Sequence, residues 1–490
     1  MNTQIDLRKE IVFASSDSDI SHQISKLTKQ GVLKKIAPKL YTTNLVDSPE
    51  NIVKRNLLSI LMWRFPKMII SHRSANEMRV TASGHFFLTG TYNRVITDLP
   101  GITIHIFKGP SPDEKDMVYG QMFIASEYRW MLENMQHSRK PESESKVLPI
   151  TVIERKLENV LISGGEEQLN LYRDTLRATA ERLNMIDEFQ EINLLISALL
   201  NTHSTDVLTS PTAKATAAGM PYDADRLQLF QNLFDLLQEQ HFIHLPLDSC
   251  SEEDYRNVAF FESYFSNYIE GTEFSVDDAY TIVDTGLPIM NRNEDSHDIL
   301  GTFQVVSNRR EMNICPTSAQ ELIEILRFRH SLILAGRPDL NPGHFKDRNN
   351  RAGNTEFVDA QKVMGTLEAG FNLYAALTSP FAKAIYMMFM ISEVHPFTDG
   401  NGRISRIMMN AEFSRAGESH IIVPTVYRED YLLSLRKLSR QSSPIPYIQA
   451  MKKLHRFSRT LYGRSFPDLL DYLKRCNAFE DANLAKLNFE

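Results

Sequence analysis

The chain contains few cysteines and no long apolar run. Its three cysteines, Cys250, Cys315 and Cys476, stand apart and are odd in number, which excludes a disulfide framework and a cysteine-rich metal site. No apolar run approaches the ~18 residues of a membrane-spanning helix, and the first residues show no secretory leader pattern. We therefore expect a cytoplasmic protein with no membrane partner.

An excess of positive charge is also lacking. Lysine and arginine total 54 against 61 acidic residues, for a formal net charge of −7, so any nucleic-acid binding must be local. Three common signatures are absent: the phosphate loop ending in Gly-Lys-Ser/Thr, the His-Glu-x-x-His zinc helix and the Rossmann glycine fingerprint. The length of 490 residues predicts about three domains.

A local cluster of lysines lies near the N-terminus. The stretch SDISHQISKLTKQGVLKKIAPKLYTT predicts an amphipathic helix that begins near Asp17 and ends at Gly31, followed by short strands near residues 33–36 and 40–43. A helix followed by a hairpin is typical of a winged helix-turn-helix, which would bind DNA through its lysines. A solvated lysine face or a protein-docking module is the alternative. The candidate DNA-binding residues are Lys26, Lys29, Lys34 and Lys35.

The first quarter of the chain also resembles a known class of proteins. Together with the segments ISHRSANEMRV and GITIHIFKGP, the lysine-bearing stretch is similar to the antitoxin or regulator half of abortive-infection toxin–antitoxin systems. This resemblance includes no catalytic signature. It implies a winged helix-turn-helix over residues 1–45 and a small α/β region over residues 46–140.

Helical periodicity dominates the remaining sequence. The polar run SRKPESESK marks a domain boundary, and two amphipathic helical stretches follow, separated by a predicted loop of small residues at 209–223. Nearly every segment after Ser251 indicates helix, except GHFKDRNNRAGNTEFV, which predicts a hairpin. We expect a mainly α chain, with a helical linker domain over residues 147–250 and a helical catalytic domain over residues 251–490.

One stretch, HPFTDGNGRISR, carries a mixture of residues that packing does not require. Gly400-Asn401-Gly402 lies where an amphipathic helix begins, so its free backbone N–H groups and the helix dipole form an anion site. Arg403 and Arg406 share one sector of that helix and can face one ligand. Asp399 suits a Mg²⁺ ion that bridges phosphates, and His395 suits removal of a hydroxyl proton. These groups predict an in-line attack on a phosphate.

This stretch resembles the signature of the Fic family. That signature is His-Pro-Phe, any residue, Asp or Glu, Gly-Asn-Gly-Arg, two free positions and Arg, and every constrained position matches. Fic enzymes mostly move AMP from ATP to a protein hydroxyl and release pyrophosphate. The resemblance implies that His395 is the general base and that Asp399 binds Mg²⁺. The nucleotide-binding residues that it implies are Phe397, Gly400, Asn401, Gly402, Arg403, Arg406 and Tyr431.

Within that set, the resemblance assigns different tasks. The glycines and Asn401 would cradle the α-phosphate, Arg403 and Arg406 would hold the β- and γ-phosphates, and Phe397 would anchor the loop in the core. Tyr431 lies where similar enzymes place an aromatic side chain beside the adenine, although a core position is equally compatible with its spacing.

Two further segments fit the same family. SNYIEG matches its inhibitory motif, Ser or Thr, three free residues, Glu, then Gly or Asn, and Ser266 and Glu270 share one face of a helix expected near residues 262–271. An ordinary helix surface is the alternative. The hairpin near residues 344–358 corresponds to the family's flap, which covers the active site and pairs with an extended target segment. Lys346 stands there in place of the commoner arginine.

We predict an autoinhibited protein adenylyltransferase that transfers AMP from ATP to a Ser, Thr or Tyr hydroxyl of a target protein or of itself, with Mg²⁺. Two alternatives use the same residues differently: removal of AMP from a modified protein, and a DNA-binding regulator that uses the Fic domain as a sensor. The sequence leaves open a homodimer and a donor nucleotide other than ATP, since the base pocket is poorly specified.

Overall fold

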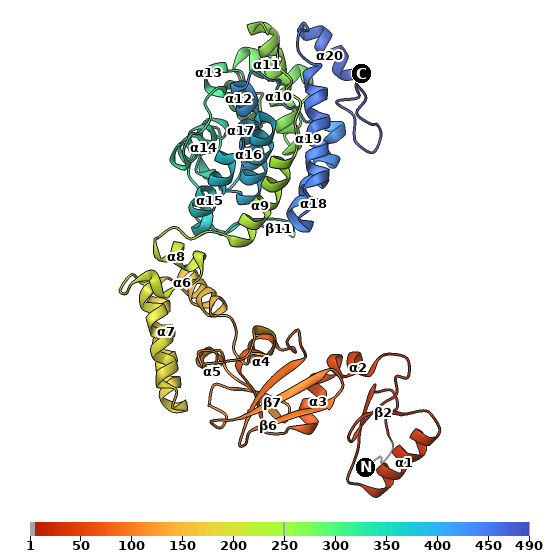
Figure 1. Cartoon of the computed structure of the whole chain (residues 1–490). Helices are drawn as coiled ribbons and strands as arrows, with labels where there is room; N and C mark the ends of the chain where they lie inside the picture. The colour runs from red at the N-terminus through yellow and green to blue at the C-terminus, as the bar shows by residue number, and fades with distance from the viewer. Residues whose placement is uncertain (1–4, 248–249, 354, 490) are drawn as a thin grey trace. The chain divides into compact units, whose positions relative to one another are not determined.

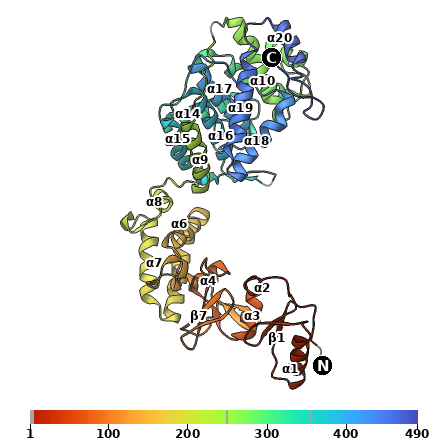
Figure 2. The same cartoon turned by 45° about the vertical axis from the view of Figure 1, so that its right-hand side comes forward.

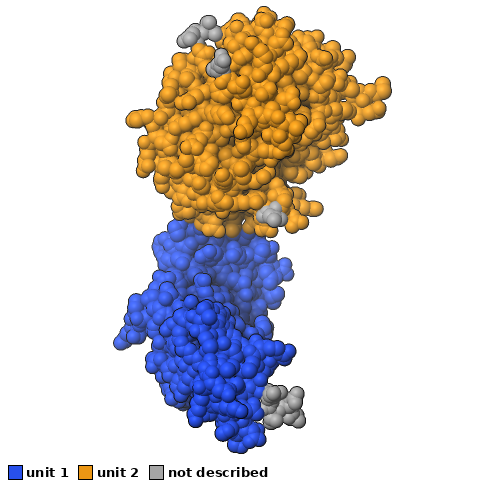
Figure 3. Space-filling view, turned by 90° about the vertical axis from the view of Figure 1, so that its right-hand side faces the viewer, with its two compact units in different colours: residues 1–217 blue, residues 218–490 orange. Residues whose placement is uncertain are grey.

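The computed structural model describes residues 5–247, 250–353 and 355–489. The chain divides into two compact units, residues 1–217 and residues 218–490 (Figure 3). Helix α9 (Ala224–Glu239), which we placed in a linker domain, packs against helices of the second unit, so the division lies at 217/218 and not near 250. Among the described residues, no helix is long and apolar enough to cross a membrane.

The first unit begins with a small antiparallel sheet and one helix. The predicted helix is α1 (Ser18–Lys29), and the Asp17 carboxylate accepts hydrogen bonds from the free N–H groups of its first turn. The predicted strands are β2 (Lys34–Ala37) and β3 (Leu40–Thr42). An additional strand, β1 (Ile11–Phe13), pairs with β3. The sequence did not predict it, because a strand of three residues is too short to show the alternation of apolar and polar residues.

A second sheet with six strands follows, in the order β6-β7-β5-β4-β9-β8. The pairing of β5 with β7 and of β4 with β9 is parallel, and the other pairs are antiparallel. The elements of this region are α2 (Pro49–Arg55), α3 (Leu57–Arg64), β4 (Ile69–Ile70), α4 (His72–Glu77), β5 (His85–Gly90), β6 (Arg94–Leu99), β7 (Ile102–Lys108), β8 (Met117–Tyr119), β9 (Met122–Ile124) and α5 (Glu127–Glu133).

Three helices complete the first unit: α6 (Ile150–Leu183), α7 (Ile186–Leu199) and α8 (Pro211–Ala217). Helix α6 is kinked at Gly165, which has a φ of 71°. The prediction of a loop at 209–223 was wrong over α8, where Ala213 and Ala217 are buried among α6 and α7. A sequence rich in small residues is typical of a loop, but in α8 the small side chains allow close packing against neighbouring helices.

The second unit is a helical domain with one short hairpin. Its elements after α9 are α10 (Glu252–Ile269), α11 (Val276–Thr285), α12 (Asn293–Val306), α13 (Arg309–Met312), α14 (Ala319–Ile333), β10 (Arg351–Ala352), β11 (Thr355–Glu356), α15 (Val363–Ala376), α16 (Pro380–Val394), α17 (Asn401–Arg415), α18 (Arg428–Gln441), α19 (Pro444–Arg459) and α20 (Phe466–Arg475). The chain is therefore mainly α, as the sequence predicts.

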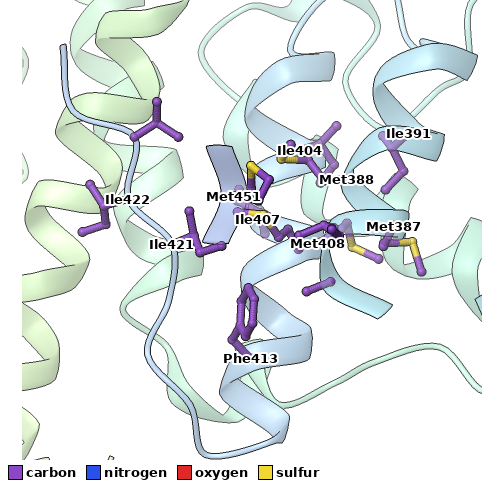
Figure 4. Packing of buried hydrophobic residues seen from close by; sticks show 14 of the residues in the cluster. Met387, Met388, Ile391, Ile404, Ile407, Met408, Phe413, Ile421, Ile422 and Met451 are labelled. Atoms are coloured by element: carbon purple, nitrogen blue, oxygen red, sulfur yellow. The ribbon is translucent and has the colours of Figure 1, made fainter. Parts of the chain in front are cut away.

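Helices α16 and α17 form the centre of this domain and lie side by side (Figure 1, Figure 2). The predicted apolar stripe of α17 is buried, and Figure 4 shows Ile404 and Ile407 packed among Met387 and Met388 of α16 and Met451 of α19. Other helices cover α17 on further sides, including α10, α12 and α14. The loop between α16 and α17 is thus attached at both ends to the most buried part of the domain.

Candidate active site

The loop from His395 to Gly400 joins α16 to α17 through a strained backbone. His395 ends α16 with a φ of 51°, and Gly400 precedes α17 with a φ of 74°, a region that favours glycine. The Asn401 side chain closes the loop: its Oδ1 accepts a hydrogen bond from the Phe397 N–H at 2.9 Å, and its Nδ2 donates to the Phe397 carbonyl at 2.8 Å. The Asn401 amide therefore shapes the loop, and its own backbone N–H lies in the first turn of α17.

Phe397 anchors this loop in the core, as the sequence predicts. Its side chain has 0% exposure, and its ring stacks on the His330 imidazole with centroids 3.6 Å apart. The Phe397 ring does not line the cavity beside the loop. Any contribution of this residue to nucleotide binding therefore acts through the loop's position.

His395 lies at the edge of a cavity of about 560 Å³. Burial lowers its pKa to about 4, and the neighbouring charge of Lys346 acts in the same direction, while the Ser392 carbonyl opposes both. The imidazole is consequently neutral near pH 7, the form that can accept a proton. Its ring stacks on Phe357, with centroids 3.7 Å apart and planes 6° apart.

Phe357 follows the hairpin at the predicted flap. Strands β10 and β11 pair antiparallel, with Arg351 opposite Glu356 and Ala352 opposite Thr355. Asn354, which we expected in the turn, lies outside the described residues. The hairpin and His395 thus share one wall of the cavity, since Ala352, Thr355 and Phe357 line it with the imidazole.

Arg406 is held by the end of helix α10. Its Nη2 lies 2.7 Å from Glu270 Oε1 and donates to the Ser266 carbonyl at 2.9 Å, while its Nε donates to the Ser266 hydroxyl at 3.0 Å. Arg406 is 5% exposed, and both Arg406 and Glu270 line the cavity. Ser266 and Glu270 of SNYIEG thus both hold the last arginine of the motif.

The Glu270 carboxylate also lies against the start of α17. A Cβ atom built on Gly402 would lie 2.1 Å from Glu270 Oε1, so a side chain at this position would collide with the carboxylate. The positive end of a helix dipole favours an anion at this place. A carboxylate oxygen thus lies in contact with Gly402, one of the residues expected to cradle a phosphate.

Arg403 lies elsewhere than we expected. Its Nη1 is 3.0 Å from Asp298 Oδ2 on α12 and donates to Asn267 Oδ1 at 3.4 Å, and its side chain is 3% exposed. It does not line the cavity that Arg406 lines. Residues three apart on a helix differ by about 60° in direction, and on a helix covered on several sides that difference suffices to give the two arginines different neighbours.

Asp399 remains at the surface of the loop. Its side chain is 53% exposed, its Oδ1 accepts the Gly400 N–H at 2.7 Å, and its Oδ2 is 3.9 Å from Arg403 Nη2. Within the described residues, no group of three or more His, Cys, Asp or Glu side chains could hold a metal ion. One accessible carboxylate beside an anion site fits Mg²⁺, which takes its other ligands from phosphates and water.

Tyr431 lies on the cavity wall formed by α18. It is 1% exposed, and burial raises its pKa while Arg406 acts to lower it. The cavity is lined by Glu270, Ala352, Gly353, Thr355, Phe357, Ser392, Glu393, His395, Gly402, Arg406, Tyr431, Leu432, Leu435, Arg436, Ser439 and Arg440. The sequence-predicted residues that meet here are His395, Gly402, Arg406, Tyr431 and Glu270.

Comparison with known proteins identifies this region. Residues 318–412 match the Fic/DOC family. The chain contains a Fic domain. The protein adenylyltransferase Fic of Drosophila persimilis is 25% identical over 254 residues, 50% of this chain and 48% of that protein. The protein adenylyltransferase fic-1 of Caenorhabditis elegans is 26% identical over 217 residues, 42% of each chain.

The chain spans about half the length of the curated relatives it matches. Among solved structures, Fic-1 of C. elegans covers 66% of this chain and 93% of its own, with 16% identity and a TM-score of 0.36. A Fic-domain signalling protein of Bacteroides thetaiotaomicron covers 50% of this chain and 97% of its own, with 18% identity and a TM-score of 0.36.

Sequence reasoning missed the residues that hold the Fic loop from outside the motif. His330 Nδ1 accepts the Gly343 N–H at 2.9 Å, so its Nε2–H donates to the Asp399 carbonyl, 3.0 Å away. Burial lowers the pKa of His330 to about 4 and keeps it neutral. A histidine within an amphipathic helix gives no sign of this role in sequence.

The segment before the flap also holds the loop. The Lys346 N–H donates to the Pro396 carbonyl at 2.9 Å, and Asn350 Nδ2 donates to the Phe397 carbonyl at 3.0 Å. Burial lowers the pKa of Lys346 to about 8, and its Nζ donates to Asn350 Oδ1 at 2.7 Å. The unusual lysine of GHFK is thus part of the support beneath the Fic loop.

The four candidate DNA-binding lysines lie in the first unit. Lys26 and Lys29 are in the last turns of α1, and Lys34 and Lys35 are in β2. All four side chains are exposed. Their role in DNA binding stays a prediction.

Proposed function

We propose that this protein transfers AMP from ATP to a hydroxyl side chain of a protein, and that Glu270 holds it in an inhibited state. The observation that carries this proposal is the pairing of Glu270 with Arg406 beside a neutral His395, in one cavity of the Fic domain. A base, a cationic phosphate ligand and an anion site at a helix N-terminus are the parts that phosphoryl transfer requires.

In the proposed reaction, the neutral His395 takes the proton of the acceptor hydroxyl. The hydroxyl oxygen then forms a bond to the α-phosphorus of ATP, and the bond from that phosphorus to the bridging oxygen of the β-phosphate breaks. Pyrophosphate leaves with the bonding electron pair, and His395 returns its proton to water. Phe357, stacked on His395, fixes the orientation of the imidazole for this step.

The chain's other residues would bind the nucleotide. Arg406 would hold the terminal phosphates once Glu270 withdraws, and the backbone of residues 400–402 would receive the α-phosphate. Arg403, paired with Asp298, would support the start of α17. Asp399 would hold Mg²⁺, which neutralises phosphate charge when bound.

The inhibition follows from the same contacts. As long as the Glu270 carboxylate pairs with Arg406, a terminal phosphate cannot take its place on that guanidinium. ATP would then bind with its phosphates displaced, and a displaced α-phosphorus is out of line with the attacking hydroxyl.

The test uses ATP labelled at the α- or the γ-phosphate. The full-length Glu270→Gly variant, incubated with Mg²⁺ and a native lysate, should label protein bands from α-labelled ATP and none from γ-labelled ATP. Labelling from the γ-position would indicate a kinase reaction and contradict the proposal. Release of AMP from previously labelled protein, without incorporation, would indicate that the site works in the reverse direction. Self-modification would appear as a labelled band at the size of the chain itself.

DNA binding and a cytoplasmic location are further proposals for this chain. The exposed lysines of α1 and β2 are the reason to retain DNA binding as a proposal, and the three unbridged cysteines are the reason to retain a cytoplasmic location. A homodimer stays a prediction.

A further inference from the structure

Helix α18 runs along the cavity and gives it two ends. Tyr431 lies beside Arg406 and Glu270, whereas Ser439 and Arg440 lie about two turns further along the same helix. Eight residues of α-helix span about 12 Å. Since Arg406 and the start of α17 define the phosphate end, the end near Ser439 is where the base of a bound nucleotide would lie.

The walls of this second end suit a base. Leu432 and Leu435 supply an apolar surface between the two ends. The flap contacts α18 at this end, because Arg440 Nη2 donates to the Thr355 hydroxyl at 2.7 Å. A flat heterocycle would be enclosed on its faces by apolar side chains and would need polar partners only along its edge.

One buried carboxyl group, that of Glu393, lines this cavity and has no task in the proposed reaction. Glu393 is 5% exposed, and its Oε2 forms no hydrogen bond within the described part of the chain. Arg226 Nε is 3.1 Å from that oxygen, but the pair does not meet the geometry of a hydrogen bond. A buried acceptor without a donor is costly, so a donor on a ligand would stabilise it.

We propose that Glu393 selects the donor nucleotide by accepting a hydrogen bond from the exocyclic amino group of an adenine-type base. This inference rests on the proposed function, since it assumes that the cavity binds a nucleoside triphosphate. Uracil and hypoxanthine carry an oxygen where cytosine and adenine carry the amino group, and that oxygen would face the carboxylate as a second acceptor. Purine itself carries no donor there and would leave Glu393 Oε2 without a hydrogen-bond donor.

The ionisation of Glu393 does not alter this argument. Burial raises the pKa of its carboxyl, while Arg226 and Ser439 act to lower it. A carboxylate accepts through either oxygen, and a protonated carboxyl still accepts through its carbonyl oxygen. The amino group of the base therefore finds an acceptor in both states.

The test compares ATP with purine riboside triphosphate, which differs from ATP only in lacking the amino group. Their affinities for the full-length protein would be measured by calorimetry with Mg²⁺. We expect wild type to bind ATP at least about tenfold more tightly, because a site built for a donor rejects an analogue that lacks it. Glu393→Met should bring the ratio of the two affinities close to one, chiefly because it weakens the binding of ATP.

Two further variants make the result decisive. Arg226→Met/Glu393→Met removes both members of the ion pair together and avoids leaving the half-buried Arg226 without its partner. Glu412→Met is the matched control, since Glu412 is also a buried carboxyl of this domain with a pKa raised by burial, but lies outside the cavity. Glu412→Met should keep the wild-type ratio of the affinities for ATP and purine riboside triphosphate.

The outcomes separate the inference from the proposed function. Equal affinities of wild type for the two nucleotides, or a ratio that survives both Glu393 variants, would overturn the role of Glu393 and leave AMP transfer intact. Absence of binding of any nucleoside triphosphate to wild type would instead count against the proposed function itself. Tighter binding of UTP than of ATP would contradict the inference directly.

Discussion

The two units differ in how they hold the residues that the sequence predicts to be functional. In the second unit, His395, Arg406 and Glu270 each contact partners from distant segments, at fixed distances within one cavity. In the first unit, Lys26, Lys29, Lys34 and Lys35 are exposed on one helix and one strand. Chemistry needs groups held in place, whereas attraction to phosphates needs only charge near a surface. Changes in the second unit should therefore alter the rate of transfer, and changes in the first should not.

The largest effect should come from His395→Ala in the Glu270→Gly background. Loss of the base should reduce AMP incorporation by at least about 100-fold, while ATP affinity stays close to that of the parent because Arg406 and the Fic loop are retained. Incorporation of α-labelled AMP and calorimetric ATP binding would be measured in parallel. A near-parental transfer rate with a hydroxyl acceptor would show that His395 is not the base.

Glu270→Gly alone should increase transfer by at least about tenfold, equivalent to roughly 1.4 kcal/mol of barrier. The physical reason is that Arg406 and the start of α17 become free for phosphates. The measurement is labelled AMP incorporation by equal concentrations of wild type and variant. Ser275→Gly is a suitable control, because it also removes a polar side chain at a helix terminus but lies outside the cavity. Unchanged incorporation by a well-folded Glu270→Gly protein would remove the basis for autoinhibition.

A smaller effect is expected from Asp399→Ala. This change should raise the Mg²⁺ concentration required for half-maximal transfer several-fold and should slow transfer at low Mg²⁺, because one carboxylate ligand is lost. Titration with MgCl₂ in the Glu270→Gly background would check it. The same metal dependence in both proteins would place the Mg²⁺ ligand elsewhere.

The response to pH should be smaller still. With its pKa lowered to about 4, His395 is already neutral at pH 5.5, so its protonation should change the transfer rate less than about twofold between pH 5.5 and 7.5. An unshifted histidine, with a pKa near 6.5, would lose about tenfold at pH 5.5. Rates in the Glu270→Gly background at saturating ATP and Mg²⁺ would distinguish the two. A tenfold loss would mean that the imidazole is more solvated than its stacking on Phe357 indicates.

No effect on transfer is expected from replacing Lys26, Lys29, Lys34 and Lys35 together by glutamine. If these lysines bind DNA, the salt dependence of binding should flatten by up to about 0.9 units of log–log slope for each lost phosphate contact. Electrophoretic shifts at several salt concentrations and the AMP incorporation assay would be run on the same protein. Reduced transfer would show instead that this surface docks on the enzyme or its target.

Much of the candidate site could be predicted because the Fic motif is contiguous. His395, Gly402 and Arg406 lie within one short stretch of the chain, and the helix that carries Gly402 and Arg406 shows a clear apolar period. The partner of Arg406 was also predictable, since SNYIEG places Glu270 at the end of a helix. Arg403 shows the limit of this reasoning. Its spacing from Arg406 predicts a shared ligand, but Asp298, more than a hundred residues earlier in the chain, attracts its guanidinium instead.

The sequence by itself determined the mainly α fold and the likeness of residues 395–406 to the Fic signature, and it predicted an anion site at residues 400–402 and a role for Glu270 beside that motif. Local patterns suffice for these features, because helix periodicity, glycine placement and short spacings depend on neighbouring residues. Only the tertiary structure decided that α9 belongs to the second unit, that His330 and Asn350 hold the Fic loop, and that Glu393 lines the same cavity as His395. These features depend on contacts between segments far apart in the chain. Tertiary packing determines which side chains are buried at such contacts and which hydrogen bonds they form, and a local sequence pattern contains no information about that packing.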